Sequence, residues 1–315
     1  MSAGAWEPYS GRFSFNLNFG NQFMEILKIF DYSTWTPTLL QRQAEESTHA
    51  LESGQLALLP RLAFELGEDE KYLLSPKWSD GKAKNISYNP LTKEVRHTSA
   101  TGADQEAIGR MMARFADCSR KLADSLFPSY AKALEWGRTS YRPVEADGRS
   151  SSVKKDDRLL HVDSFSSSPV QGARILRIFS NINPEGKSRE WTLGEPFNDL
   201  APRFLPRIPK PAPGSAWLLK TLGITKGIRT AYDHYMLQLH DLGKLDSHYQ
   251  QTSPKTAVSL PANSSWIVYT DLVPHAVQSG QYALEQTFYL PVEAMQTPEL
   301  SPLRKLENLL GRKLA

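Results

Sequence analysis

The spacing of apolar residues predicts one long helix in the first half of the chain. Within residues 104–127, apolar side chains recur three and four positions apart, at Ile108, Met111, Met112, Phe115, Cys118, Leu122 and Leu126. This period places them on one side of a helix. Because methionine fills irregular gaps in cores, the Met pair is interpreted as core packing rather than as part of a cofactor site. Residues 1–150 are therefore predicted to form an α-rich cap packed on the core.

The second half of the chain shows short apolar runs that are typical of strands. Residues 158–163 (RLLHVD) and 174–184 (RILRIFSNINP) predict two of them. In the second run Ile175, Arg177 and Phe179 share one face, because side chains alternate along a strand. Leu176 and Ile178 then occupy the opposite face.

Two further strands are predicted near the C-terminus, with a helix before them. They cover residues 266–270 and 282–290, and the turn between them holds Pro274, His275 and Gly280. The helical pattern covers about residues 227–250. Strands that flank a helical insert favour an antiparallel barrel or sandwich, so residues 151–300 are predicted to be the core of an α+β protein. The polar, Gly- and Ser-containing residues 145–158 predict a surface loop at the boundary.

Composition limits the class of protein. The chain has 315 residues, of which 40% are hydrophobic and 23% are charged, which is typical of a soluble globular protein. It has no apolar run near the roughly 18 residues that a membrane span needs and no secretory signal pattern, so a cytoplasmic location is expected. Cys118 is the only cysteine and is interpreted as a packed thiol. The chain contains no Gly-rich phosphate loop, CxxC pair or nucleophile elbow.

Positive charge is concentrated in one region although the net charge is only +3. Residues 203–229 contain six Lys or Arg and no Asp or Glu, with apolar residues between them. Such a region attracts phosphates or an anionic membrane. The alternative, a solvated loop whose charges serve solubility, remains open at this point.

The last residues, 301–315, predict a short basic amphipathic helix. Leu303, Leu306, Leu310 and Leu314 recur at helical spacing, and basic residues fill the other face. This helix either docks on the core of the protein or lies on a membrane surface. Both interpretations are retained.

A metal site is the main candidate chemistry. His161 and Asp163 are two apart in a predicted strand, so their side chains point the same way. His275 is the best third ligand, because it follows an apolar strand in a predicted turn. Two histidines and one carboxylate form the facial triad of non-haem iron oxygenases. The rivals His234, His240 and His248 lack the i, i+4 spacing of helical metal pairs.

Longer motifs give a family resemblance. The HVD run, GARILRIFSNINPEG and WIVYTDLVPHAVQSGQYALEQTFYLPV resemble the double-stranded β-helix, a jelly-roll or cupin-like core, of iron(II)/2-oxoglutarate-dependent dioxygenases. REWTLGEPF, LPRIPKP, YDHYMLQLHD and LEQTFYLP are similar to the hydroxylases of Kdo (3-deoxy-D-manno-oct-2-ulosonic acid) over residues 155–312. The resemblance implies that His161, Asp163 and His275 hold Fe(II). It also implies that 2-oxoglutarate and O₂ are consumed to give succinate, CO₂ and a hydroxylated carbon.

The arginine that binds the distal carboxylate of 2-oxoglutarate is not where many superfamily members have it. Tyr282 stands at that position, seven residues after His275. Arg177 is the predicted anchor, because guanidinium binds carboxylate bidentately and an inward arginine needs an anionic partner. Arg174 is the second candidate, and Tyr282 could donate a hydrogen bond instead. In the alternative, Arg177 pairs with a structural carboxylate or faces water.

For the substrate, the resemblance implies the outer Kdo sugar of Kdo2-lipid A or its precursor, converted to the octulosonic acid Ko. Its phosphates and carboxylates would suit the basic region, and an anionic inner-membrane surface would suit the C-terminal helix. Arg142, Lys220 and His240 are candidate substrate contacts. The expected location is the cytoplasmic face of the inner membrane, with no nucleic-acid partner and no obligate protein partner. An oxygenase of another glycan or small molecule, and a non-catalytic binding module for anionic lipid or sugar, remain as alternatives.

Overall fold

The computed structural model describes residues 26–148 and 151–315 and contains two β-sheets. Its strands are β1 (Leu27–Ile29), β2 (Leu56–Leu59), β3 (Ile86–Tyr88), β4 (Val95–Arg96), β5 (Glu135–Arg142), β6 (Arg174–Asn181), β7 (Arg189–Leu193), β8 (Thr256–Leu260), β9 (Ser265–Tyr269), β10 (His275–Ser279) and β11 (Ala283–Leu290). The large sheet has the order β1-β2-β9-β6-β11-β5-β3-β4, and the small sheet has the order β10-β7-β8. All pairs are antiparallel except β1 with β2.

The two sheets pack face to face and form the predicted jelly-roll core. One apolar cluster joins them, with Phe179 and Trp266 from the large sheet against Trp191 and Val258 from the small sheet. Leu176, from the other face of β6, belongs to a second cluster that includes helix residues. Strand β6 is thus covered on both faces, which explains why Ile175, Leu176, Ile178 and Phe179 are apolar on both of its sides.

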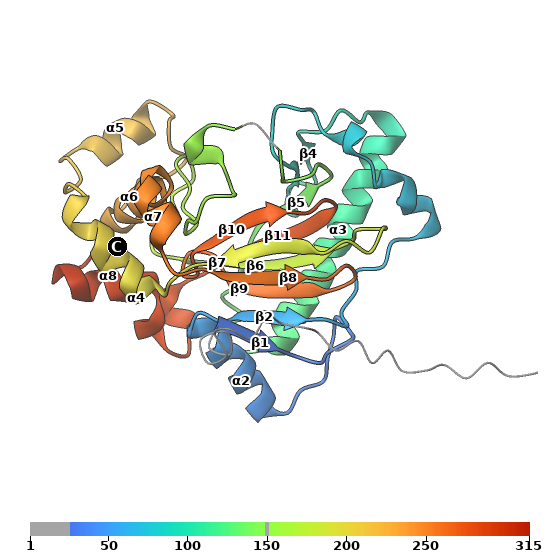
Figure 1. Cartoon of the computed structure of the whole chain (residues 1–315), viewed down its shortest axis with the longest axis horizontal. Helices are drawn as coiled ribbons and strands as arrows, with labels where there is room; N and C mark the ends of the chain where they lie inside the picture. The colour runs from blue at the N-terminus through green and yellow to red at the C-terminus, as the bar shows by residue number, and fades with distance from the viewer. Residues whose placement is uncertain (1–25, 149–150) are drawn as a thin grey trace, which may run out of the picture.

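The helices cover the outside of the large sheet and one end of the sandwich (Figure 1). They are α2 (Gln41–Glu52), α3 (Gly102–Leu126), α4 (Phe197–Phe204), α5 (Ser215–Thr221), α6 (Ala231–Leu245), α7 (Ser247–Thr252) and α8 (Pro302–Leu310). The long predicted helix is α3, whose Ile108 and Phe115 are fully buried. The helix expected over residues 227–250 corresponds to α6 and α7, which follow α4 and α5 between β7 and β8.

Residues 26–148 do not form an α-rich cap on the core, because β1 to β5 all belong to the large sheet, and this corrects the expected boundary near residue 150. Strand β5 pairs with β11, and β2 pairs with β9, so both are internal strands of the large sheet. The short strands β3 and β4 extend the same sheet. These strands could not be predicted from the sequence, because two or three residues are too few to show an alternation of apolar and polar positions.

Two local predictions near the histidines are also corrected. Residues 158–163 form no regular strand, and only His161 makes a bridge, to His275. The chain there turns from one partner to another: the Asp163 amide donates to the Thr270 carbonyl instead of continuing along β10. The expected turn between the last two strands contains a strand of its own, β10, which begins at His275.

The C-terminal amphipathic helix docks on the core. In α8 and the residues after it, Leu303, Leu306 and Leu314 are buried in the main helical cluster. Its apolar side is therefore covered by protein and is not available to a membrane in this structure. None of the helices in the described residues is long and apolar enough to span a bilayer.

Candidate metal and co-substrate site

Three metal-ligand side chains meet at the mouth of the sandwich. His161 and Asp163 come from the extended segment before β6, and His275 begins β10. Each offers one ligand atom, and these atoms all lie within 4.8 Å of one another. All three side chains are buried. The structure therefore brings together the three ligands predicted from the sequence, in the 2-His-1-carboxylate set suited to non-haem iron.

Backbone carbonyls orient both imidazoles. His161 Nδ1 lies 2.7 Å from the Leu159 carbonyl oxygen, and His275 Nδ1 lies 2.9 Å from the Val273 carbonyl oxygen. An Nδ1–H that donates to a carbonyl leaves the Nε2 lone pair free for a metal. The two histidines also exchange backbone hydrogen bonds of 2.9 and 3.1 Å, which fixes the spacing of their side chains. The donor set thus fits a divalent metal ion.

Burial keeps the ligands in the protonation states that a metal requires. It lowers the pKa of His161 well below its ordinary value, and His275 and Lys244 lower it further. Burial likewise lowers the pKa of His275. Burial alone would raise the pKa of Asp163, but the Arg177 guanidinium outweighs it and holds that pKa below its usual range. The site therefore presents two neutral imidazoles and one carboxylate at neutral pH.

We expect the metal-free protein to lose stability as the pH falls from about 7 to about 5. The ordinary histidine pKa of 6.5 applies to the unfolded chain, while His161 and His275 have lower values when folded. Between these values only the unfolded chain takes up the protons, so acid favours unfolding. Melting temperatures of the metal-free protein across this range test the expectation. The double variant His161→Gln/His275→Gln should show a smaller decrease, and an equal decrease in both proteins would contradict the assignment.

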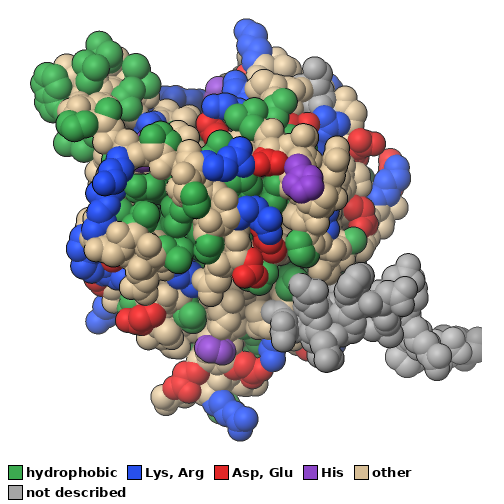
Figure 2. Space-filling view, turned by 60° about the vertical axis from the view of Figure 1, so that its left-hand side comes forward, with side chains coloured by type: hydrophobic (Ala, Val, Ile, Leu, Met, Phe, Trp, Pro, Cys, Tyr) green, Lys and Arg blue, Asp and Glu red, His purple; other side chains and the backbone are tan. Residues whose placement is uncertain are grey.

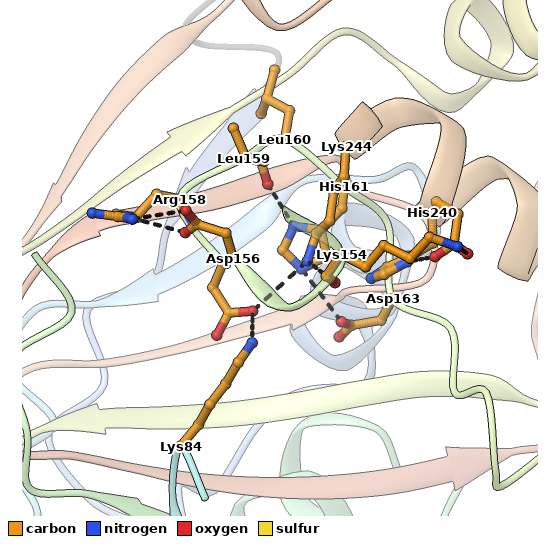
Figure 3. Close-up of polar contacts among 12 residues, drawn as sticks. Lys84, Lys154, Asp156, Arg158, Leu159, Leu160, His161, Asp163, His240 and Lys244 are labelled. Atoms are coloured by element: carbon orange, nitrogen blue, oxygen red, sulfur yellow. Dashed lines mark hydrogen bonds and ion pairs between the residues drawn. The ribbon is translucent and has the colours of Figure 1, made fainter. Parts of the chain in front are cut away.

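A cavity of about 350 Å³ opens beside the three ligands. Its lining contains seven Lys or Arg and only two Asp, one of which is the ligand Asp163. In Figure 3, Lys84 and Lys244 approach His161 from opposite sides, and His240 lies to the right of His161. The volume suits a small ligand, and the excess of positive charge favours an anionic one.

Buried ion pairs link the metal ligands to the cavity wall. Arg177 Nη1 lies 3.0 Å from Asp163 Oδ2, and Arg177 Nε lies 3.4 Å from Glu285 Oε1. Glu285 also pairs with Arg142, whose other neighbour is Asp157 at 3.9 Å. Charges alternate along this chain of side chains, so each buried charge has a partner of opposite sign. Arg177 faces the site as the strand alternation predicted, and it pairs with carboxylates as the alternative interpretation held.

Strand β7 adds two residues that the sequence analysis did not single out. Arg189 and Trp191 both line the cavity, two positions apart on one face of the strand. Trp191 stacks on the His275 ring with centroids 5.3 Å apart, and its buried Nε1 has no hydrogen-bond partner among the described residues. This N–H is therefore available as a hydrogen-bond donor at the cavity wall. In the sequence, the alternation in residues 189–193 (REWTL) indicates only that Arg189 and Trp191 share one face of a strand. The pairing of β7 with β10 is what brings that face to His275.

The two other candidate anchors for the co-substrate lie away from the cavity. Arg174 is fully buried on the opposite side of β6, where its Nε lies 2.7 Å from Asp271 Oδ2 and its guanidinium covers the Tyr269 ring. Tyr282 packs on the cluster around α3 and has a φ of 59° in the bend before β11. Neither residue lines the cavity. Both assignments are therefore corrected, because strand alternation turns Arg174 to the far face and the bend turns Tyr282 outward.

Of the three candidate substrate contacts, the structure brings two to the site. Arg142 and His240 both line the cavity. The His240 ring meets the His161 ring edge to face at 5.4 Å, and its Nδ1 lies 2.9 Å from Asp241 Oδ1. Lys220 is exposed on α5 and does not line the cavity, which corrects its assignment as a pocket residue.

Comparisons with known proteins agree with this geometry. The family model described as 3-deoxy-D-manno-oct-2-ulosonic acid (Kdo) hydroxylase matches residues 34–313. A crystal structure of the Kdo hydroxylase KdoO, a non-haem Fe(II) α-ketoglutarate-dependent dioxygenase, in complex with α-ketoglutarate and Fe(III) is similar to this chain. It has 46% identity and a TM-score of 0.89 over 92% of this chain and 97% of that chain.

Further solved structures of KdoO show the same similarity. The complex with cobalt(II) has 47% identity and a TM-score of 0.89, covering 91% of this chain and 97% of its own. The complex with succinate and Fe(III) has 46% identity and a TM-score of 0.88 over the same shares. Comparison with curated protein sequences gave no match. The resemblance read from the sequence motifs is therefore confirmed, and the chain belongs to the Kdo hydroxylase family of iron(II)- and 2-oxoglutarate-dependent dioxygenases.

Proposed function

We propose that this protein hydroxylates the outer Kdo sugar of Kdo2-lipid A, or of its precursor, to Ko, with 2-oxoglutarate converted to succinate and CO₂. The observation that carries the proposal is the buried facial triad in the wall of a strongly cationic cavity. The site then acts at the cytoplasmic face of the inner membrane, on a sugar that is attached to a lipid.

His161, Asp163 and His275 would hold the iron through two Nε2 atoms and one carboxylate oxygen. Bound iron supplies the activation of O₂ that hydroxylation of an unreactive carbon needs. The chain's own part is to keep the imidazoles neutral and oriented, through burial and the Leu159 and Val273 carbonyls. The side chains at the base of the cavity also exclude bulk water, because all three ligands are buried.

We assign the binding of 2-oxoglutarate to the arginines that line the cavity. Arg177, Arg142 and Arg189 reach it from three strands, β6, β5 and β7. A guanidinium fork matches a carboxylate, and the Trp191 N–H can donate to an oxygen of the same ligand. Arg177 lies next to Asp163, so it is placed to bind a dianion whose other end is at the metal.

The lysines of the outer cavity wall suit an anionic sugar. Lys244 of α6, Lys154 and Lys155 of the short turn at 153–155, and Lys84 in the loop before β3 all line the cavity. Two of them have carboxylate partners at 2.6 Å, Lys84 with Asp157 and Lys154 with Asp241. Burial lowers the pKa of Lys244. A Kdo carboxylate would gain ion pairs with this wall that a neutral sugar could not form.

The test is turnover with defined substrates. Iron-loaded protein receives 2-oxoglutarate and O₂ with Kdo2-lipid A, with lipid A that lacks Kdo, or with neither, and the lipid is analysed by mass spectrometry. We expect one added oxygen on Kdo2-lipid A alone, together with succinate above the background of the other two samples. Succinate without lipid oxidation would overturn the substrate assignment. The absence of succinate in every sample would overturn the enzymatic function.

A further inference from the structure

Exposed apolar side chains gather on α5 and the loop that follows it. Within residues 217–228, Trp217, Leu218, Leu222, Ile224 and Ile228 are 44–66% exposed. They are five of the twelve large hydrophobic side chains that are exposed in the described part of the chain. Figure 2 shows hydrophobic side chains on a protrusion at the upper left, the end of the molecule where α5 lies in Figure 1. Contiguous apolar surface of this kind marks an interaction site.

This segment contributes almost nothing to the core of the protein. None of the seven residues of α5 is buried. The adjoining glycines Gly214 and Gly223 have positive φ values of 75° and 68°, so the short helix stands between two bends. Trp217 and Leu218 therefore contribute little to the core, and their apolar surface is available to another molecule.

The charge around the apolar tip is positive only. Residues 203–229 carry no carboxylate, and Lys210, Lys220 and Lys226 are exposed. Among the described residues none of these three lysines forms an ion pair, whereas Arg203 and Arg207 of the same region are paired with Glu195 and Asp246. Exposed apolar side chains with unpaired lysines in the same segment match a bilayer with anionic headgroups.

Hydrogen bonds connect this surface to the rim of the cavity. The Lys226 amide donates to the Ser167 carbonyl at 2.9 Å, and Arg229 Nη2 donates to the Ser166 carbonyl at 2.7 Å. Residues 164–168 line the cavity beside the metal ligands. Binding that fixes the position of the loop after α5 would therefore also fix residues 164–168, which form one wall of the cavity.

We propose that α5 and the following loop, residues 215–229, insert their apolar side chains into an anionic lipid bilayer, and that this contact sets the cavity mouth at the membrane surface. Trp217, Leu218 and Leu222 enter the interface, while Lys220 and Lys226 contact phosphate headgroups. The delivery of a lipid-linked sugar to the cavity rests on the proposed function, but the docking itself does not. Of the two segments for which the sequence allowed membrane contact, residues 203–229 and the C-terminal helix, only the first leaves a group of apolar side chains exposed.

Flotation of the full-length protein with vesicles tests the docking without any substrate. The vesicles contain phosphatidylethanolamine with phosphatidylglycerol, or phosphatidylcholine alone. The triple variant Trp217→Ser/Leu218→Ser/Leu222→Ser should bind the anionic vesicles at least tenfold more weakly than wild type. The control Leu40→Ser/Leu91→Ser/Leu309→Ser removes three exposed leucines elsewhere, which are 49–74% exposed, and should bind like wild type. The pair Lys220→Glu/Lys226→Glu should lose most binding to anionic vesicles.

Equal vesicle binding by wild type and the α5 triple variant would overturn the proposal, as would equal binding to neutral and anionic vesicles. A wild-type dimer that the triple variant converts to monomer, without vesicle binding by either, would also overturn it and assign the surface to a second copy. Cobalt(II) and 2-oxoglutarate binding, which should be unchanged, confirm that each variant is folded. If Kdo2-lipid A is not oxidised but the vesicle results hold, the proposed substrate fails and the docking surface stands.

Discussion

Replacing His275 with alanine is expected to abolish succinate formation and to remove most of the bound metal. The three ligand atoms lie within 4.8 Å of one another in a buried site, and the variant keeps only one imidazole and one carboxylate. Loss of a group that merely orients a ligand costs roughly 10- to 100-fold in metal affinity, so loss of a ligand should exceed this. His161→Ala should behave in the same way.

Cobalt(II) titration and succinate release measure the two effects separately. His49→Ala is the matched control, because His49 is an exposed histidine on α2 far from the ligand set in sequence and not in the cavity lining. Its metal affinity and turnover should equal those of wild type. Wild-type succinate formation by purified His275→Ala would contradict the assignment of the triad.

Replacing Arg177 with lysine is expected to raise the KM for 2-oxoglutarate by roughly 10- to 100-fold, which corresponds to about 1.4 to 2.8 kcal/mol. Lysine keeps the positive charge that faces Asp163 and Glu285, so the metal site should survive. It loses the planar fork that binds a carboxylate bidentately. The affinity for cobalt(II) should therefore change much less than the KM for 2-oxoglutarate.

Arg138→Lys provides the matched comparison for this measurement. Arg138 lies on β5 of the same sheet and contacts Ser87, and it does not line the cavity. Its KM for 2-oxoglutarate should not change. If Arg189→Lys or Arg142→Lys raises the KM while Arg177→Lys leaves it unchanged, the anchor is one of those two arginines and the prediction for Arg177 is wrong.

The ligand triad could be found in the sequence because its chemistry restricts residue type and spacing. His161 and Asp163 are two apart, and His275 stands at the end of an apolar run. The assigned strand was nevertheless wrong, since only a single bridge joins the two histidines. The side chains still converge because the backbone is extended on both sides of that bridge, and extended backbone projects residues i and i+2 in the same direction.

The anchor for the co-substrate was harder to predict because it depends on which face of a strand meets the metal. Arg174 and Arg177 are both on β6, but an odd separation along a strand puts them on opposite faces. Arg174 forms an ion pair with Asp271 on the far face, while Arg177 forms an ion pair with Asp163 in the site. Arg189 and Trp191 enter the cavity only through the pairing of β7 with β10, a contact between segments more than 80 residues apart.

The sequence by itself determined the family, the candidate metal ligands and the long helix α3, since each depends on residue type or on a period within one segment. Tertiary structure alone decided which of two amphipathic segments is covered. Both residues 203–229 and the C-terminal helix alternate basic and apolar positions, yet Leu306 is fully buried while Trp217 is 66% exposed. The physical reason is that local pattern specifies an apolar side, but only packing against a distant core removes that side from water.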